Sequence, residues 1–141
     1  MTDIKDFNEK ELCALALEAM KASYSPYSRY TVGAALLCGS GKVYLGANIE
    51  NAAYTPTVCA ERVAFFKAVS EGERSFVAIA LCGGKEGNAQ DTVSPCGVCR
   101  QVMTEFCTPD FPIIMCKRGG EYERHTLGEL LPMSFSYENI K

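Results

Sequence analysis

Two apolar runs joined by a short turn decide the fold; they occupy residues 30–49, which read YTVGAALLCGSGKVYLGANI. Both runs are rich in residues that favour β-strands. The Gly-Ser-Gly sequence between them is a hairpin signal. Because a link this short can join only antiparallel neighbours, the sequence predicts paired strands at residues 30–38 and 42–49.

Strand and helix signals alternate in the rest of the chain. Residues 75–82 are almost continuously apolar, as in a strand that is buried on both faces. Further strands are expected at residues 111–117 and 122–125, and helices at residues 8–23, 57–69, 94–107 and 127–131. This order predicts an α/β fold, a three-layer α/β/α sandwich with a mixed five-stranded sheet. The length of 141 residues fits a single domain over residues 1–141.

Caps and apolar stripes define the expected helices more closely. Asn8 can cap the first helix, and Ser94 is expected to cap the third, with Pro95 at its first helical position. The apolar stripe of the first helix comprises Leu12, Leu15, Ala16, Ala19 and Met20. The apolar face of the second comprises Val63, Ala64, Phe66 and Ala68.

Composition and charge exclude several classes of protein. Hydrophobic residues make up 48% and charged residues 22%, a balance that excludes a disordered chain. The net charge of −3 disfavours a nucleic-acid partner, because such binding depends on neutralising phosphates. No stretch approaches the roughly 18 apolar residues of a membrane span. Residues 1–10 are rich in charge and lack the apolar core of a secretory signal, so we expect a cytoplasmic protein.

Cysteine is the unusual residue, since the chain has eight cysteines and one histidine. An even number permits a disulfide framework. In the reducing cytosol, however, cysteines are usually metal ligands, catalysts or small buried residues. Three cysteines lie at expected helix starts, and the other five are expected to be inert buried residues: Cys13, Cys38, Cys82, Cys107 and Cys116. His125 is expected at the surface, near a strand end.

Cys59, Cys96 and Cys99 lie where two of the expected helices begin. Cys96 and Cys99 are three residues apart, so their thiols share one face of a helix. Helix starts gather at the carboxyl edge of the strands in α/β sheets, and a helix N-terminus lowers the pKa of a thiol. The three thiolates can therefore meet and bind a metal.

Three thiolates would suit a catalytic zinc ion. Zn²⁺ is tetrahedral, so three protein ligands leave a fourth position open for water, which the metal makes a better nucleophile. Arg62 is the nearest fixed cation that can offset the negative charge of the thiolates, and Arg100 is a second candidate. Glu61 can serve as a proton shuttle beside the metal if Cys59 projects off the helix end.

Other interpretations of these thiols remain open. Cys96 and Cys99 alone could form a structural zinc clamp or a redox dithiol. A structural site would take a fourth thiol from the remaining cysteines, and the chain would then be a non-catalytic zinc-stabilised binding module. The Cys-Ala-Glu sequence at a second helix start favours the catalytic interpretation.

The sequence resembles the short-chain, homotetrameric zinc cytidine deaminases over nearly its whole length. The metal motif alone marks the wider cytidine and deoxycytidylate deaminase superfamily, including its all-cysteine variant with a glutamate that is not a ligand. The Asn-Ile-Glu-Asn segment narrows the resemblance to enzymes that act on free nucleosides. The similar segments are residues 27–36 (YSRYTVGAAL), 48–54 (NIENAAY), 59–62 (CAER), 94–101 (SPCGVCRQ), 129–132 (ELLP) and Phe135.

This resemblance implies hydrolytic deamination of cytidine and deoxycytidine to uridine and deoxyuridine, with release of ammonia, in pyrimidine salvage. It implies one zinc ion per chain, held by Cys59, Cys96 and Cys99. Zinc-bound hydroxide would attack C4 of the pyrimidine. Glu61 would take the proton of the water, deliver one to N3 and assist the departure of ammonia, while Arg62 would hydrogen-bond the thiolates.

The resemblance also implies which residues bind the nucleoside. Asn48 and Glu50 would hold the ribose 3′-hydroxyl, and the backbone amide of Ala60 would contact O2 of the base. Tyr30 takes the place of a phenylalanine that packs against the base in the family. Two residues would reach the site from a neighbouring subunit of a homotetramer: Tyr54 and Phe135.

Alternatives to these assignments concern the substrate and two of the residues. Small deaminases of aminoacyl-nucleoside antibiotics such as blasticidin S share the zinc motif, but the Asn48 and Glu50 pair argues against that substrate. A carboxylate accepts hydroxyl hydrogen bonds strongly and repels a 5′-phosphate, which favours nucleosides over nucleotides. The acidic charge balance disfavours a polynucleotide substrate. Without the resemblance, Asn48 and Glu50 could form a polar turn, and Phe135 could be a core residue.

Overall fold

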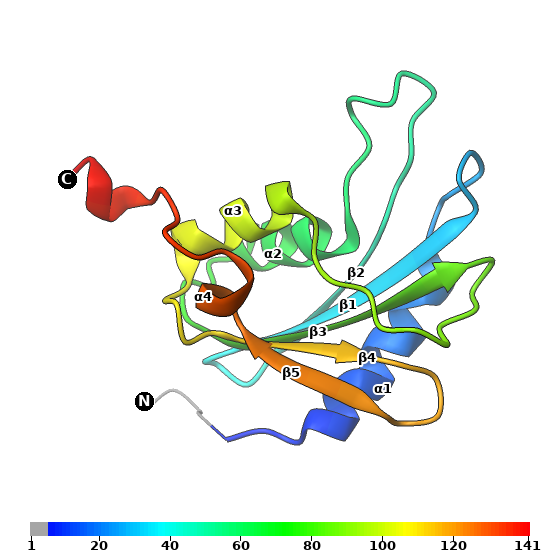
Figure 1. The fold of residues 1–141 in the computed structure, drawn as a ribbon, viewed down its shortest axis with the longest axis horizontal. Coiled ribbons are helices and arrows are strands. Elements are labelled where there is room, and N and C mark those ends of the chain that lie inside the picture. Colours follow the sequence, from blue (N-terminus) through cyan, green and yellow to red (C-terminus); the bar gives the residue numbers. More distant parts are fainter. Residues whose placement is uncertain (1–5) are drawn as a thin grey trace.

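Five strands form the middle layer of the protein, in the order β2-β1-β3-β4-β5 (Figure 1). The structure is a computed structural model that describes residues 6–141. The expectation that residues 1–10 are not a secretory signal therefore falls partly outside the described residues. The strands are β1 (Tyr30–Cys38), β2 (Val43–Ala47), β3 (Phe76–Lys85), β4 (Pro112–Cys116) and β5 (Tyr122–Thr126). Of the pairs among these five strands, β3–β4 is parallel and the other three are antiparallel, so the sheet is mixed, as expected.

Helices cover both faces of the sheet (Figure 1). The helices are α1 (Glu9–Ala19), α2 (Ala60–Ser70), α3 (Gly97–Phe106) and α4 (Leu127–Leu130), with short 3₁₀ turns η1 (Met20–Ala22) and η2 (Tyr137–Asn139). α1 packs on one face through Leu12 and Ala16, whereas Phe65 of α2 and Met103 of α3 belong to the core on the other face. This arrangement confirms the three-layer α/β/α sandwich.

The directions of the central strands bring both helix starts to one edge of the sheet. β2 and β3 each run antiparallel to β1, so their carboxyl ends lie beside the start of β1: Ala47 pairs with Gly33, and Lys85 pairs with Tyr30. α2 follows β2 and α3 follows β3, and both helices therefore begin near this edge. The long loop at residues 48–59 rises from the same end of the molecule (Figure 1).

Two glycines allow helices to lie close to the sheet. A Cβ atom on Gly33 would stand 2.2 Å from the carbonyl oxygen of Ala16 in α1. A Cβ atom on Gly46 would stand 2.3 Å from the carbonyl oxygen of Ala60, the first residue of α2. Both distances are far below van der Waals contact. Gly46 therefore fixes how closely the start of α2 can approach β2.

Both helices at this edge begin later than the sequence predicts. α2 starts at Ala60, so Cys59 is its N-cap rather than part of its first turn. The expectation that Ser94 caps α3 is wrong, because Cys96 is the N-cap and its Sγ accepts a hydrogen bond from the backbone N–H of Cys99 at 3.4 Å. A thiol therefore serves here as the N-cap acceptor, a position where Ser, Thr, Asp and Asn are the preferred residues.

Two apolar positions point the other way from what their spacing predicts. Phe65 is fully buried in α2, whereas Phe66 is 49% exposed. In α1 the buried stripe includes Cys13, and Leu15 is exposed. Successive helical residues point about 100° apart. An apolar face that is assigned one residue away from the true position therefore includes side chains that point to solvent.

The cysteines outside the helix starts divide into two groups. Cys13 of α1 and Cys116 of β4 form a disulfide between positions 103 residues apart in sequence. The expectation of five independent buried thiols is therefore wrong for this pair. Cys38 and Cys82 are buried and Cys107 is half-buried. Burial raises the pKa of Cys38 and of Cys82 to about 12, so both are protonated at neutral pH.

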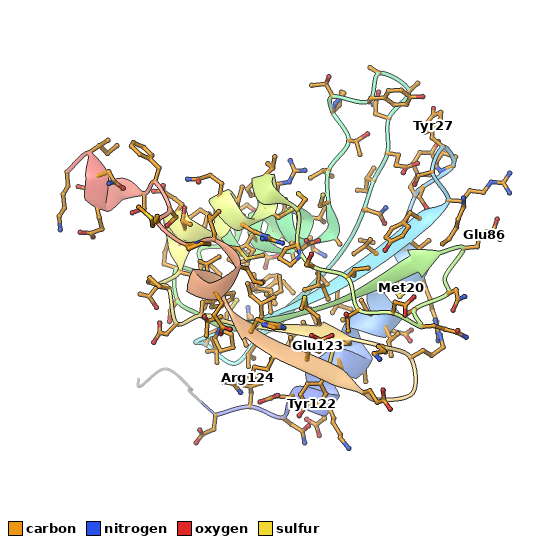
Figure 2. All side chains as sticks on the ribbon, viewed as in Figure 1. Met20, Tyr27, Glu86, Tyr122, Glu123 and Arg124 are labelled. Atoms are coloured by element: carbon orange, nitrogen blue, oxygen red, sulfur yellow. A yellow bond between two sulfur atoms is a disulfide. The ribbon has the colours of Figure 1, made fainter. Side chains whose placement is uncertain are left out.

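Charged side chains protect the edge strand β5. Figure 2 shows Tyr122, Glu123 and Arg124 on this strand. Arg124 pairs with Glu9, and its guanidinium lies 5.7 Å from the centroid of the Phe7 ring. Charges on an edge strand discourage pairing with another chain.

His125, also in β5, is partly exposed and lies 3.2 Å from Glu123, in line with the expected surface position. In the part of the chain that the structure describes, no helix combines the length and apolarity needed to cross a membrane.

Candidate functional site

Three thiols meet where α2 and α3 begin. The Cys59 and Cys96 sulfurs lie 3.5 Å apart, and the Cys96 and Cys99 sulfurs lie 3.3 Å apart. A tetrahedral zinc ion with Zn–S bonds near 2.3 Å holds its sulfurs about 3.8 Å apart. The donor set therefore fits zinc after small adjustments. Among residues 6–141, no fourth Cys, His, Asp or Glu joins this group, and one coordination position remains for a non-protein ligand.

Capping geometry places each of these sulfurs. Cys59 and Cys96 are the N-caps of α2 and α3, with extended backbones that carry their thiols off the helix ends. Cys99 is the third residue of α3, and its backbone N–H binds the Cys96 sulfur. The N-terminal ends of both helices thus lie at the thiols, where their dipoles stabilise negative charge.

Hydrogen bonds among the thiols and from Arg62 change the pKa values of two of the cysteines. A hydrogen bond from Cys99, followed by the nearby Arg62 guanidinium, lowers the pKa of Cys59 to about 5. The same hydrogen bond, together with burial, raises the pKa of Cys99. Arg62 Nη2 donates to the Cys59 sulfur at 3.5 Å. Arg62 is therefore placed to offset negative charge on the Cys59 sulfur.

Arg100 does not have the role that its sequence position suggested. Its Nε donates to the carbonyl oxygen of Pro95 at 2.7 Å, and its Nη1 donates to that of Leu130. The side chain therefore links the start of α3 to the end of α4 and does not contact the thiols.

Glu61 is a buried carboxyl beside the thiols. It is the second residue of α2 and is 3% exposed. Burial, assisted by the charge of Cys59, raises its pKa to about 7. A carboxyl with a near-neutral pKa can both accept and return a proton at physiological pH.

A cavity of about 470 Å³ joins this carboxyl and the thiols to the polar residues after β2. Its walls include six of the residues singled out from the sequence: Tyr30, Asn48, Glu50, Cys59, Glu61 and Cys96. Ala60 is fully buried, and as the first residue of α2 its N–H has no partner within the helix. The structure thus brings residues from three separate segments into one site.

Hydrogen bonds fix the amide of Asn48. Its Oδ1 accepts from the N–H of Val32 at 2.9 Å and from the hydroxyl of Ser23 at 2.5 Å. Its Nδ2 donates to the carbonyl oxygen of Tyr30 at 2.7 Å. An amide has two N–H donors, so one remains for another partner.

Glu50 is held by the loop that precedes β1. Its Oε1 accepts from the backbone N–H groups of Tyr27 at 2.9 Å and Ser28 at 3.1 Å, and its Oε2 accepts from the Ser28 hydroxyl. The Ser28 hydroxyl, followed by these N–H groups, lowers the pKa of Glu50, which keeps the carboxylate ionised. Tyr27 marks this loop in Figure 2.

Tyr54 and Phe135 lie outside the cavity. Tyr54 is 71% exposed and has a left-handed backbone, and its ring packs edge-on against Tyr27, with centroids 6.1 Å apart. Phe135 is 61% exposed on the segment after α4. The alternative that Phe135 is a core residue is therefore wrong.

Two serines near the site were not identified from the sequence. Ser23 binds Asn48 and Ser28 binds Glu50, across 25 and 22 residues of sequence. Both lie in residues 23–28, whose three serines and single proline indicate only the end of a helix. Nothing in the local pattern shows which distant side chain a serine will contact.

Comparison with known proteins places the chain in a family. Residues 7–115 match the model of the cytidine and deoxycytidylate deaminase zinc-binding region. A cytidine deaminase of Sporosarcina psychrophila is 49% identical over 131 residues, 93% of each chain. A blasticidin-S deaminase of Bacillus cereus is 30% identical over 94% of this chain and 99% of its own length.

A solved structure agrees with these matches. The crystal structure of cytidine deaminase from Burkholderia pseudomallei superposes with a TM-score of 0.84 at 39% identity, covering 92% of this chain and all of the other. The family match spans more than half of the chain and includes all three thiols. The chain belongs to the cytidine and deoxycytidylate deaminase family, whose members share a zinc-binding region.

Proposed function

We propose that this chain hydrolyses cytidine and deoxycytidine to uridine and deoxyuridine, with release of ammonia, as a step of pyrimidine salvage. One observation carries the proposal. The buried carboxyl of Glu61 shares a cavity with the thiols of Cys59 and Cys96 and with the polar side chains of Asn48 and Glu50. The groups proposed to act in the reaction and the polar groups that could bind a ribose thus line the same cavity.

The chain's own residues would divide the chemistry between them. Cys59, Cys96 and Cys99 would hold one zinc ion, which acts as a Lewis acid and makes a water molecule nucleophilic. Glu61 would accept the proton of that water, return one to N3 of the base and assist the departing ammonia. Arg62 would limit the negative charge of the thiolates.

The base and the ribose would contact different parts of the cavity. The N–H of Ala60, free of helix bonding, would donate to O2 of the base, and Tyr30 would pack against the ring. The remaining N–H of Asn48 and the carboxylate of Glu50 would bind the ribose 3′-hydroxyl. The negative charge of Glu50 would repel a substrate phosphate.

We also propose a homotetramer in which Tyr54 and Phe135 complete the site of a neighbouring subunit. Their large exposed fractions support this proposal, since both rings are far more accessible than a core aromatic. Light scattering should give four times the mass of the 15.4 kDa chain. A monomer that turns over cytidine at full rate would contradict the shared site.

A side-by-side assay tests the substrate. Ultraviolet absorbance should show conversion of cytidine and deoxycytidine, with little conversion of blasticidin S. The similarity to a blasticidin-S deaminase makes the third compound a necessary comparison. Turnover of blasticidin S alone would overturn the proposed substrate. Zinc analysis and X-ray absorption should give one zinc with three sulfur ligands, and a fourth sulfur would indicate the non-catalytic binding module instead.

A further inference from the structure

One carboxylate joins the loop before β1 to the segment after β2. Glu50 accepts two backbone N–H groups on Oε1 and the Ser28 hydroxyl on Oε2. A carboxylate offers about four acceptor positions. These three bonds therefore leave one position, on Oε2, for a ligand in the cavity that Glu50 and Ser28 both line.

The Ser28 hydroxyl is itself oriented by a second bond. Its oxygen accepts the backbone N–H of Tyr30 at 3.0 Å. The turn between them includes Arg29, whose φ of 60° lies in the left-handed region that few non-glycine residues adopt. A hydroxyl has a single proton. With its oxygen held by Tyr30, that proton is directed to Glu50.

We propose that Ser28 is a positioning residue for substrate binding, which fixes Glu50 so that the remaining acceptor position of Oε2 meets the ribose 3′-hydroxyl. The inference rests on the proposed ribose contact of Glu50 and extends it to the group that orients this contact. Ser28 touches neither the reacting atoms nor the thiols.

The proposal makes a specific kinetic prediction. Without the Ser28 hydroxyl, Oε1 stays bound to the two backbone N–H groups but Oε2 loses its protein partner, and substrate binding must then bear the cost of ordering Oε2. The ribose lies away from C4, so ground state and transition state lose the same contact. A uniform loss of this kind raises KM and leaves kcat unchanged. For Ser28→Ala we expect a KM for cytidine about tenfold higher and a kcat within about twofold of wild type.

A matched control separates this role from a structural one. Ser40 has the same pattern away from the site, since its hydroxyl donates to Glu73 and its oxygen accepts the N–H of Lys42. Ser40→Ala should therefore leave KM and kcat unchanged. Ser28→Thr keeps the hydroxyl and Ser28→Val replaces it with a methyl of similar size, so only the valine variant should raise KM. Ser28 is exposed, which leaves room for the added methyl.

The experiment compares cytidine with 3′-deoxycytidine for wild type and each variant. The expected result is that wild type binds 3′-deoxycytidine more weakly and that the KM effect of Ser28→Ala disappears with this substrate. If wild type has the same KM for both substrates, the proposed contact between Glu50 and the ribose is wrong, and the role of Ser28 is wrong as well. If wild type discriminates but Ser28→Ala raises KM equally for both, or lowers kcat, Ser28 is not the positioning residue and the ribose contact stands.

Discussion

Glu61 combines deep burial with a pKa near neutrality, and both properties bear on its proposed role. Glu61→Gln keeps the size of the side chain but removes its ability to accept a proton. We expect kcat to fall by at least about 10²-fold, while bound zinc and circular dichroism stay as in wild type. Glu73→Gln, which changes a carboxyl in the turn between α2 and β3, should have no such effect. Near-normal turnover by Glu61→Gln would remove the proton-shuttle role.

We expect Arg62 to lower the pH at which the thiols release zinc. Its guanidinium, after the hydrogen bond of Cys99, lowers the pKa of Cys59. In Arg62→Gln the pKa of Cys59 rises, so protons compete with zinc more strongly at a given pH. As the pH is lowered, zinc should therefore be released at a higher pH than from wild type, as measured with a coloured chelator. Arg100→Gln is the matched control, because Arg100 binds carbonyl oxygens instead of thiols. Superimposable release curves for Arg62→Gln and wild type would contradict this account.

At the scale of elements, the strands follow from the sequence more closely than the starts of α2 and α3. β1 has the predicted bounds, because an apolar, β-rich run between a loop and a glycine turn leaves little choice. α3 does not begin as predicted, because Cys96 caps it and rules for capping do not anticipate a thiol. Cys59 and Cys96 were thus easy to recognise as candidate metal ligands but were not recognised as the N-caps of α2 and α3.

The start of α2 depends on a glycine in the neighbouring strand. Gly46→Ala would place a methyl 2.3 Å from the carbonyl oxygen of Ala60 and push the helix start, with Cys59, away from the sheet. We expect a loss of about 1–3 kcal/mol of unfolding free energy and weaker zinc binding, measured by thermal denaturation and metal analysis. Gly97→Ala adds the same methyl at the start of α3, where nothing lies within 4 Å, and should leave stability unchanged. Equal stability of the two variants would show that the approach of α2 to β2 is not tightly constrained.

At the scale of the whole molecule, long-range contacts are what the sequence does not contain. The thiols, Glu61 and Arg62 could be grouped because they lie in two short motifs. The link between Cys13 and Cys116 could not, because it depends on how α1 crosses the sheet and joins positions 103 residues apart. The exposure of Phe135 likewise emerges only when the segment after α4 is seen to leave the core.

The Cys13–Cys116 disulfide should contribute to stability. A crosslink that closes a loop of about 100 residues stabilises a fold by up to about 4–5 kcal/mol, by restricting the unfolded chain. A phosphine reductant should therefore lower the melting temperature of wild type, but not that of the Cys13→Ala/Cys116→Ala variant. Without reductant, the denatured, metal-free chain should present six reactive thiols. An identical response of both proteins to the reductant would rule out this contribution.

The same disulfide determines which parts of the polypeptide stay covalently joined after a single proteolytic cut. The loop closed between Cys13 and Cys116 contains the three proposed zinc ligands, Glu61 and Glu50, whereas Phe135 lies beyond it. A protease that cuts the exposed stretch at residues 51–56 would leave two fragments joined by the disulfide, and these fragments would still carry every proposed zinc ligand. A cut after α4 would instead release the tail that carries Phe135, so proteolysis can remove the proposed contribution to a neighbour while sparing the chain's own metal site.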